Sequence, residues 1–128
     1  MRTLFATTLA LLMLISVALG AGNQTEQTSQ AFTSFWGEFK AAVAKNDRET
    51  VASLTKFPFL FGQKELSRAE FIKSYNSIFD QKAQRCFARA KPVKEKDGAG
   101  YNVFCGQKIY AFDLIDGKYR FIEIGAND

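Results

Sequence analysis

The residues with the most specific chemistry are the chain's two cysteines, Cys86 and Cys105, and the chain contains no histidine. Because histidine is the commonest general base and the commonest metal ligand, its absence argues against most acid–base catalysis and against a metal site. In an oxidising compartment two lone cysteines most simply pair, closing a loop of about 20 residues and stabilising the fold by ~3 kcal/mol. A reactive thiol is the alternative, but the chain has neither a Cys-x-x-Cys spacing nor a histidine to activate one. We therefore expect a disulfide, no bound metal and no cofactor.

Three aspartates, Asp47, Asp80 and Asp113, are the candidates for acid–base chemistry. Asp113 could act as a general base if apolar neighbours raised its pKa, but its expected cross-strand partner Arg120 would lower that pKa. Asp47 is more typical of a helix start. Asp80 falls near the end of an expected helix, which is unfavourable for a structural aspartate, and a solvated helix end is the simpler interpretation. We assign none of them a catalytic role.

Aromatic side chains could line an apolar cavity in which phenol hydroxyls orient a small ligand. The candidates for such a cavity are Trp36, Tyr75, Tyr110, Phe112 and Phe121. Aromatic stripes at helical or strand spacing more usually form ordinary core. The sequence leaves both interpretations open.

Cations concentrate between residues 82 and 96, where Glu95 is the one acidic residue. The candidate partner-binding patch within this stretch consists of Arg85, Arg89 and Lys91. Such a patch could bind an acidic partner protein, a lipid headgroup or a cell-envelope polyanion, whereas a solvated strand face is the default interpretation. The formal net charge of the whole chain is +4, which is too small an excess to indicate nucleic-acid binding.

Residues 1–20 have the layout of a secretory signal peptide. A short cationic start precedes an apolar run at Leu9–Val17, and small residues occupy positions −3 and −1 before the expected cleavage at Ala21. The run is too short to span a membrane, and no cysteine directly follows it for lipid attachment. We expect an exported protein, periplasmic or secreted, with no membrane anchor, in which residues 21–128 form a single domain.

Apolar periodicity predicts three helices, over residues 29–45, 46–56 and 67–81. The second is expected to begin at Asn46, and the third at Ser67, whose hydroxyl forms a capping box with Glu70. Between them, the apolar run at residues 57–61 predicts a brief strand.

After Ala83 the pattern predicts strands only. Asp116-Gly117 is a strong signal for a two-residue hairpin turn, and Gly106 indicates a bulge or bend. The hairpin register predicts three pairs, Asp113 with Arg120, Phe112 with Phe121, and Ile109 with Ile124.

A polar turn over residues 94–98 precedes the hairpin. If Val93 pairs with Gly98 across this turn, the same register places Cys86 directly opposite Cys105. Such opposition suits a cross-strand disulfide. The predicted strand pairing and the predicted disulfide therefore support each other.

The resulting order, α-α-β-α-β-β-β, resembles that of the NTF2-like superfamily, a cone-shaped α+β fold. The segments that carry the resemblance are residues 35–43, 57–59, 67–71, 109–112 and 117–121. The resemblance implies three N-terminal helices packed on a curved antiparallel sheet, with a cavity between the first helix and the sheet. Members of that superfamily include isomerases, dehydratases and cyclases as well as ligand binders, dimerisation modules and immunity proteins. Several of its enzymes use a histidine or paired acids inside the cone, and this chain has no histidine.

These features favour an exported, non-catalytic binding protein. It would recognise a protein partner, for example as an inhibitor or immunity protein, or a small apolar ligand. The alternative is a cofactor-independent isomerase or lyase acting on a small apolar substrate, which would need a carboxylate buried beside a tyrosine. A third hypothesis is a homodimer formed through the open sheet face.

Overall fold

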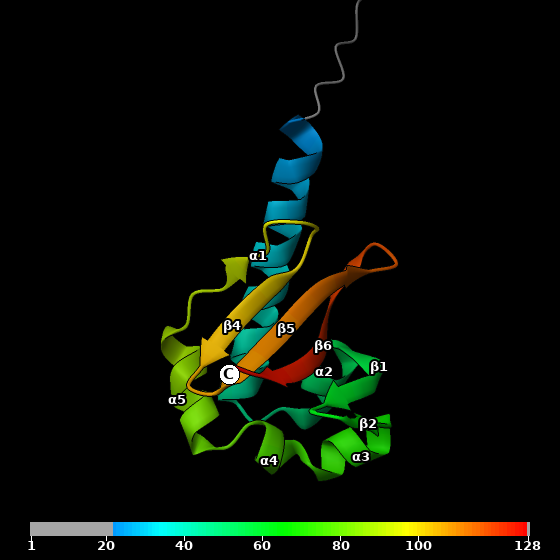
Figure 1. Ribbon diagram of the computed structural model, residues 1–128, viewed down its shortest axis with the longest axis vertical. Coiled ribbons are helices and arrows are strands. Elements are labelled where there is room, and N and C mark those ends of the chain that lie inside the picture. The colour runs from blue at the N-terminus through cyan, green and yellow to red at the C-terminus, as the bar shows by residue number, and fades with distance from the viewer. Residues whose placement is uncertain (1–21, 128) are drawn as a thin grey trace, which may run out of the picture.

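The computed structural model describes residues 22–127, with side chains from Gln27 onward, so the predicted signal peptide lies outside the described residues. An open six-stranded sheet packs against helices, with α1 running behind strands β4 and β5 in the view of Figure 1. The α+β fold class expected from the sequence is confirmed. In chain order the elements are α1 (Gly22–Ala44), α2 (Arg48–Ser53), β1 (Thr55–Phe61), β2 (Lys64–Leu66), α3 (Arg68–Lys73), α4 (Tyr75–Ile78), α5 (Gln81–Arg89), β3 (Val93–Lys94), β4 (Tyr101–Cys105), β5 (Lys108–Ile115) and β6 (Lys118–Ala126).

The sheet is mixed, which corrects the expectation of a purely antiparallel sheet. Its strand order is β2-β1-β6-β5-β4-β3, and β1 runs parallel to its neighbour β6. A parallel pair needs a long crossover connection, and the helices between β1 and the later strands provide it. The pairing begins where the Phe121 backbone N–H donates to the Leu54 carbonyl at 2.9 Å.

The hairpin between β5 and β6 turns at Asp116 and Gly117, both with positive φ, as expected for a type I′ turn. The structure confirms two of the predicted pairs, Asp113–Arg120 and Phe112–Phe121. The third pair is wrong, because a register shift adds one residue to β6 and sets Ile109 opposite Gly125 instead of Ile124.

The prediction of strands throughout residues 84–124 is wrong at its start, where α5 covers Gln81–Arg89. The helix forms because the Asp80 carboxylate accepts a hydrogen bond from the Ala83 backbone N–H at 2.8 Å, and because Ala83 and Phe87 bury one face. Sequence patterning missed this helix because only these two apolar residues mark its buried face among many cations.

Cys86 therefore lies on a helix, and the predicted strand register that placed it opposite Cys105 is wrong. The disulfide itself is confirmed, and it joins α5 to β4 with a Cα–Cα distance of 5.8 Å. The predicted register was wrong because the turn between the two strands is longer than expected, so that Val93 pairs with Asn102 and not with Gly98.

Three other local predictions are adjusted by the structure. Gly106, with φ of 63°, turns the chain directly from β4 into β5, so it forms a bend and not a bulge, the second of the two expected alternatives. The second helix begins after Asp47, which caps it, because Asn46 adopts a positive φ of 52°. The capping box of Ser67 with Glu70 is confirmed, but the helix it opens is divided into α3 and α4.

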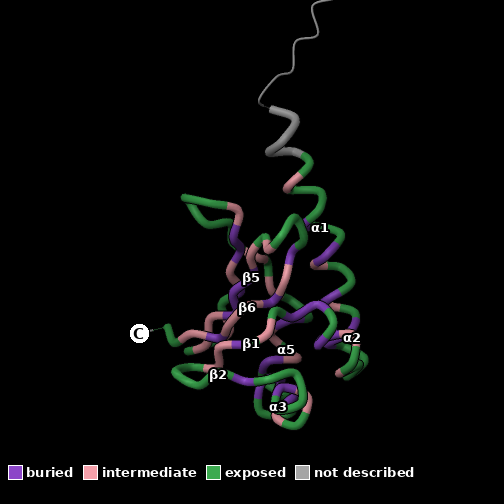
Figure 2. The backbone as a smooth tube through the Cα atoms, turned by 90° about the vertical axis from the view of Figure 1, so that its right-hand side faces the viewer, coloured by how far each residue is buried: buried purple, intermediate pink, exposed green. Residues whose placement is uncertain are grey.

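An aromatic cluster fills the space between α1 and the sheet, where buried segments meet in Figure 2. The ring of Phe39, which is fully buried, lies 5.1 Å from Phe112 on β5 and 5.3 Å from Phe121 on β6. It also lies 6.0 Å from Phe79 and 6.1 Å from Phe87. One side chain of α1 thus contacts the sheet and α5 together.

We expect Phe39→Ala to lower the free energy of unfolding by about 3–5 kcal/mol, since it removes buried apolar surface and leaves a cavity. Phe104 on β4 is 48% exposed, so Phe104→Ala is the matched control and should change stability by less than ~1 kcal/mol. Urea unfolding of both variants measures the difference. Equal losses in the two variants would contradict the placement of Phe39 at the centre of the core.

Candidate functional site

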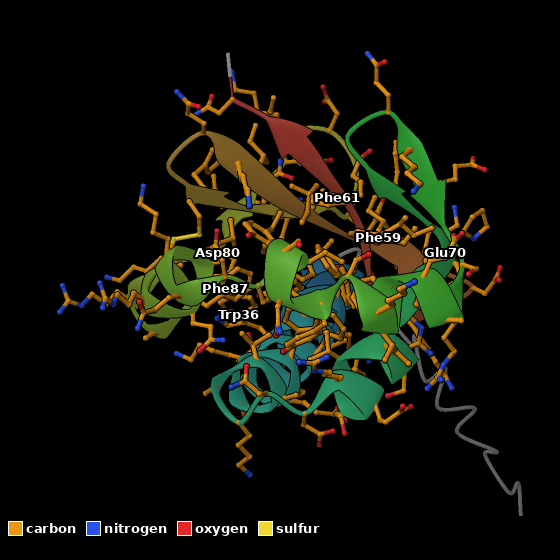
Figure 3. The ribbon with its side chains drawn as sticks, turned by 90° about the horizontal axis from the view of Figure 1, so that it is seen from below. Trp36, Phe59, Phe61, Glu70, Asp80 and Phe87 are labelled. Atoms are coloured by element: carbon orange, nitrogen blue, oxygen red, sulfur yellow. A yellow bond between two sulfur atoms is a disulfide. The ribbon has the colours of Figure 1, made fainter. Side chains whose placement is uncertain are left out.

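The surface around α5 brings together several residues that the sequence marks as candidates. Asp80 lies two residues after the end of α4, near a helix end as expected, and it also begins α5 as its N-cap, which the sequence did not predict. Phe87 anchors the helix in the core, with its ring 5.5 Å from Trp36 and 4.8 Å from Tyr110. Figure 3 shows Asp80, Phe87 and Trp36 one after another from the α5 region toward α1.

The disulfide holds the middle of α5 against the end of β4. Cys86 and Cys105 are both half-buried, and the described residues contain no free cysteine. Their sequence separation of 19 corresponds, in the chain-entropy model, to a stabilisation of about 3 kcal/mol. Residues of α5 are therefore presented from a covalently fixed helix.

The predicted basic patch lies on α5 and on the segment that directly follows it, and not on a strand face. Arg85 and Arg89 are four residues apart, so they project from the same side of α5, and exposed Lys91 follows the helix. The part of the chain that the structure describes contains two ion pairs, Arg68–Glu49 and Lys108–Asp80. The three patch residues therefore have no ion-pair partner there. Arg85 and Arg89 border a shallow, mainly apolar hollow of about 560 Å³ over Ala88 and Ala90.

Four of the five aromatic residues considered as cavity lining pack against one another, whereas Tyr75 packs against Phe79 with ring centres 5.1 Å apart. The ring of Phe112 lies 5.7 Å from that of Trp36 and 5.3 Å from that of Phe121, and the Tyr110 ring lies 6.0 Å from Phe121. Trp36 is half-buried, and the other four residues of the predicted set are buried. This arrangement places them in the core cluster.

The two fully buried tyrosines differ in how their hydroxyls are satisfied. The Tyr110 hydroxyl donates to the Ile78 carbonyl at 2.8 Å. The Tyr75 hydroxyl is buried without a hydrogen-bond partner among the described residues, and desolvation raises the pKa of Tyr75 to about 12. The Arg48 guanidinium lies over the Tyr75 ring, 5.3 Å from its centre. Neither tyrosine has a carboxylate buried beside it.

The three candidate aspartates make structural hydrogen bonds. Asp47 accepts from the Thr50 hydroxyl and backbone N–H, and these bonds lower the pKa of Asp47. Asp80 caps α5, and half-buried Asp113 accepts from the Leu114 backbone N–H at 2.7 Å. Every aspartate and glutamate side chain within residues 27–127 is exposed or half-buried, so the isomerase or lyase alternative has no buried carboxylate there.

No group of three or more potential metal-ligating side chains occurs within the described residues. The same part of the chain contains no helix that is long and apolar enough to cross a membrane. Comparisons with protein families, with curated proteins and with solved structures find no match for this chain.

Sequence reasoning did not single out a second hollow beside α5, which is lined in part by Gln107 and Lys108. These residues lie in the turn from β4 and at the start of β5, 18 and 19 positions after Arg89, the last residue of α5. No local pattern places them there. The sequence did contain a signal for α5. Asp80 is three residues before Ala83, as an N-cap requires, and Ala83 and Phe87 have the i, i+4 spacing of a buried helix face.

The contrast between the two buried tyrosines gives a testable difference. We expect Tyr75→Phe to leave stability unchanged or raise it by up to ~1 kcal/mol, because it removes an unpaired buried hydroxyl. Tyr110→Phe is the matched control and should lower stability by about 1 kcal/mol, because the Ile78 carbonyl loses its donor. Urea unfolding near pH 7 measures both changes. A larger loss for Tyr75→Phe than for Tyr110→Phe would contradict the hydrogen bonding described above.

The raised pKa of Tyr75 also predicts a pH dependence. The folded state retains the phenol proton above the ordinary pKa of 10.0, so stability falls as the pH rises from there toward about 12. Tyr75→Phe should make this alkaline decline shallower. Unfolding free energies measured between pH 8 and pH 11 test this, and parallel profiles for the wild type and the variant would contradict it.

Proposed function

We propose that this chain is an exported, non-catalytic binding protein that recognises an acidic surface of a partner protein through the basic face of α5. The basic face is defined as Arg85, Arg89 and Lys91. The observation that carries the proposal is that all three cations are exposed and lack an ion-pair partner among the described residues. Inhibition of, or immunity to, an envelope-active protein is one concrete form of this function.

The rigidity of α5 favours recognition over simple solvation of these charges. The disulfide and buried Phe87 already fix the helix, so a partner would not have to order the backbone on binding. The two arginines can each present a planar pair of donors to a carboxylate. The hollow over Ala88 and Ala90 adds apolar surface between them.

Export is supported by the disulfide, which persists in oxidising compartments, together with the signal-peptide layout of residues 1–20. The NTF2-like arrangement is likewise a proposal. Its support is an early helix, α1, that packs by an aromatic stripe against the meander β4–β5–β6. The parallel β1–β6 pair and the additional helix α5 are features that the sequence did not lead us to expect.

A protein partner is favoured over a small ligand held inside the cone. Phe39, Phe112 and Phe121 occupy the space between α1 and the sheet with ring separations of 5.1–5.3 Å. Such spacing is that of directly packed aromatic rings. The unpaired charges, in contrast, lie on the outside of the molecule.

The test uses the mature chain, residues 21–128, immobilised and incubated with an extract of the source cell's envelope. Arg85→Glu, Arg89→Glu and Lys91→Glu are combined in one variant. We expect the wild type to retain one protein in stoichiometric amount, and the variant to bind it at least ten times more weakly, because the attraction becomes like-charge repulsion. Titration of the recovered protein measures the affinity of each form.

A second variant controls for the change in net charge. It combines Lys56→Glu, Lys73→Glu and Lys118→Glu, which alter exposed lysines away from α5 by the same total charge. This control should bind the partner within about threefold of the wild type, because charges at a distance are screened by salt. Equal weakening of both variants, or full binding by the α5 variant, would contradict the proposal.

A further inference from the structure

A second hollow, of about 630 Å³, lies between the start of α5 and the turn that joins β4 to β5. This volume is within the range of sites that bind small molecules. It is separate in composition from the basic face, since it contains none of Arg85, Arg89 and Lys91. Its lining consists of Asp80, Lys82, Ala83, Cys86, Cys105, Gly106, Gln107, Lys108 and Tyr110.

The apolar surface of this hollow that a ligand could reach comes from the disulfide. Ala83 and Tyr110 also line the hollow, but both side chains are buried, whereas Cys86 and Cys105 are half-buried. The Tyr110 hydroxyl does not serve a ligand in this arrangement, because it already donates to the Ile78 carbonyl at 2.8 Å. An apolar group could therefore rest on the two sulfur atoms, which are polarisable.

The charged groups at the rim are not equally available. Asp80 accepts from the Ala83 backbone N–H, and its second oxygen lies 3.8 Å from the Lys108 ammonium, which also donates to the Ser77 carbonyl at 3.5 Å, so both charged groups are already engaged within the protein. Lys82 is exposed and has no hydrogen bond or ion pair within the described residues, and the Gln107 side-chain amide also has no partner there. One cation and one amide donor therefore remain for a ligand.

We propose that this hollow binds an apolar carboxylic acid, with its hydrocarbon part on the disulfide and its carboxylate between Lys82 and Gln107. The lining favours a negatively charged ligand. The carboxylate of Asp80 is already engaged within the protein, and the two free groups, Lys82 and Gln107, can both donate hydrogen bonds. The acid is either a free small molecule or the terminal residue of a peptide chain. This proposal goes beyond the basic face of α5 and stands without it.

The experiment titrates ¹⁵N-labelled mature chain with 4-phenylbutyrate and, as a matched neutral probe, with 4-phenyl-1-butanol. We expect the acid to shift the amide resonances of residues 82–86 and 105–108 with a dissociation constant of about 1 mM, which is typical for a ligand of this size. The alcohol should bind about tenfold more weakly, since it lacks the charge-assisted bond. Equal binding of both probes, shifts confined to other residues, or no shift with the acid at 10 mM would overturn the proposal.

Two variants locate the carboxylate. Lys82→Glu should weaken binding of 4-phenylbutyrate at least tenfold, and Gln107→Ala should weaken it by about threefold. Lys73→Glu, an equal charge reversal of an exposed lysine on α3, is the control and should leave binding of the acid unchanged. Equal loss of binding in Lys73→Glu and Lys82→Glu would overturn the site assignment.

Two tripeptides distinguish the sources of the acid. Acetyl-Ala-Ala-Phe with a free terminal carboxylate and the same peptide with a terminal amide are compared in the same titration. If the free acid shifts residues 82–86 and the amide does not, a peptide terminus fits the site. If neither tripeptide shifts these residues while 4-phenylbutyrate does, the site takes a free small acid. Binding of the amide as strongly as the acid would overturn recognition of a carboxylate.

Discussion

The attachment of α5 to the sheet is the constraint on which both proposed binding surfaces depend. The helix has nine residues, too few to be stable by itself in water, and it buries only Ala83 and Phe87. The disulfide between Cys86 and Cys105 attaches the helix covalently to β4, and Cys86 lies between Ala83 and Phe87 in the chain. Cys86 lines both the hollow over Ala88 and Ala90, which Arg85 and Arg89 of the basic face border, and the hollow proposed to bind a carboxylic acid (the carboxylate hollow).

The aromatic core determines where this attachment can occur. Phe87 fits beside Trp36 and Phe39 of α1 and against Tyr110 of β5, so the same cluster that joins α1 to the sheet also receives α5. Close packing in this cluster fills the space between α1 and the sheet with protein side chains. Recognition is therefore proposed at the surface next to the cluster and not within it.

Much of the fold could be predicted where the signals are local. The aromatic stripe of α1, the capping box at Ser67 and the hairpin turn at Asp116 each depend on residues within a few positions of one another, and the structure contains all three. The helix α5 was missed because its cations resemble a solvated strand face, and because Ala83 is too small to give a strong apolar signal. The pairing of the two cysteines was predictable by count, although its geometry was not.

Features that arise from distant segments could not be read from local patterns. The parallel β1–β6 pair and the extra residue in β6 depend on how β1 is placed beside a strand some sixty residues later in the chain. The carboxylate hollow similarly combines Lys82 with Gln107, which are brought together by the turn at Gly106 and by the disulfide. Their residue types gave no sign of this proximity.

Hydrogen exchange of the α5 backbone amides tests the central claim most directly. The mature chain with its disulfide is compared with a Cys86→Ser/Cys105→Ser double variant, and protection in α5 is read against protection in β5 and β6. The account predicts that protection in α5 falls at least tenfold further than protection in the two strands, because local opening of a helix held only by Ala83 and Phe87 becomes easier. An equal change in α5 and in the strands, or no change in α5, would contradict it.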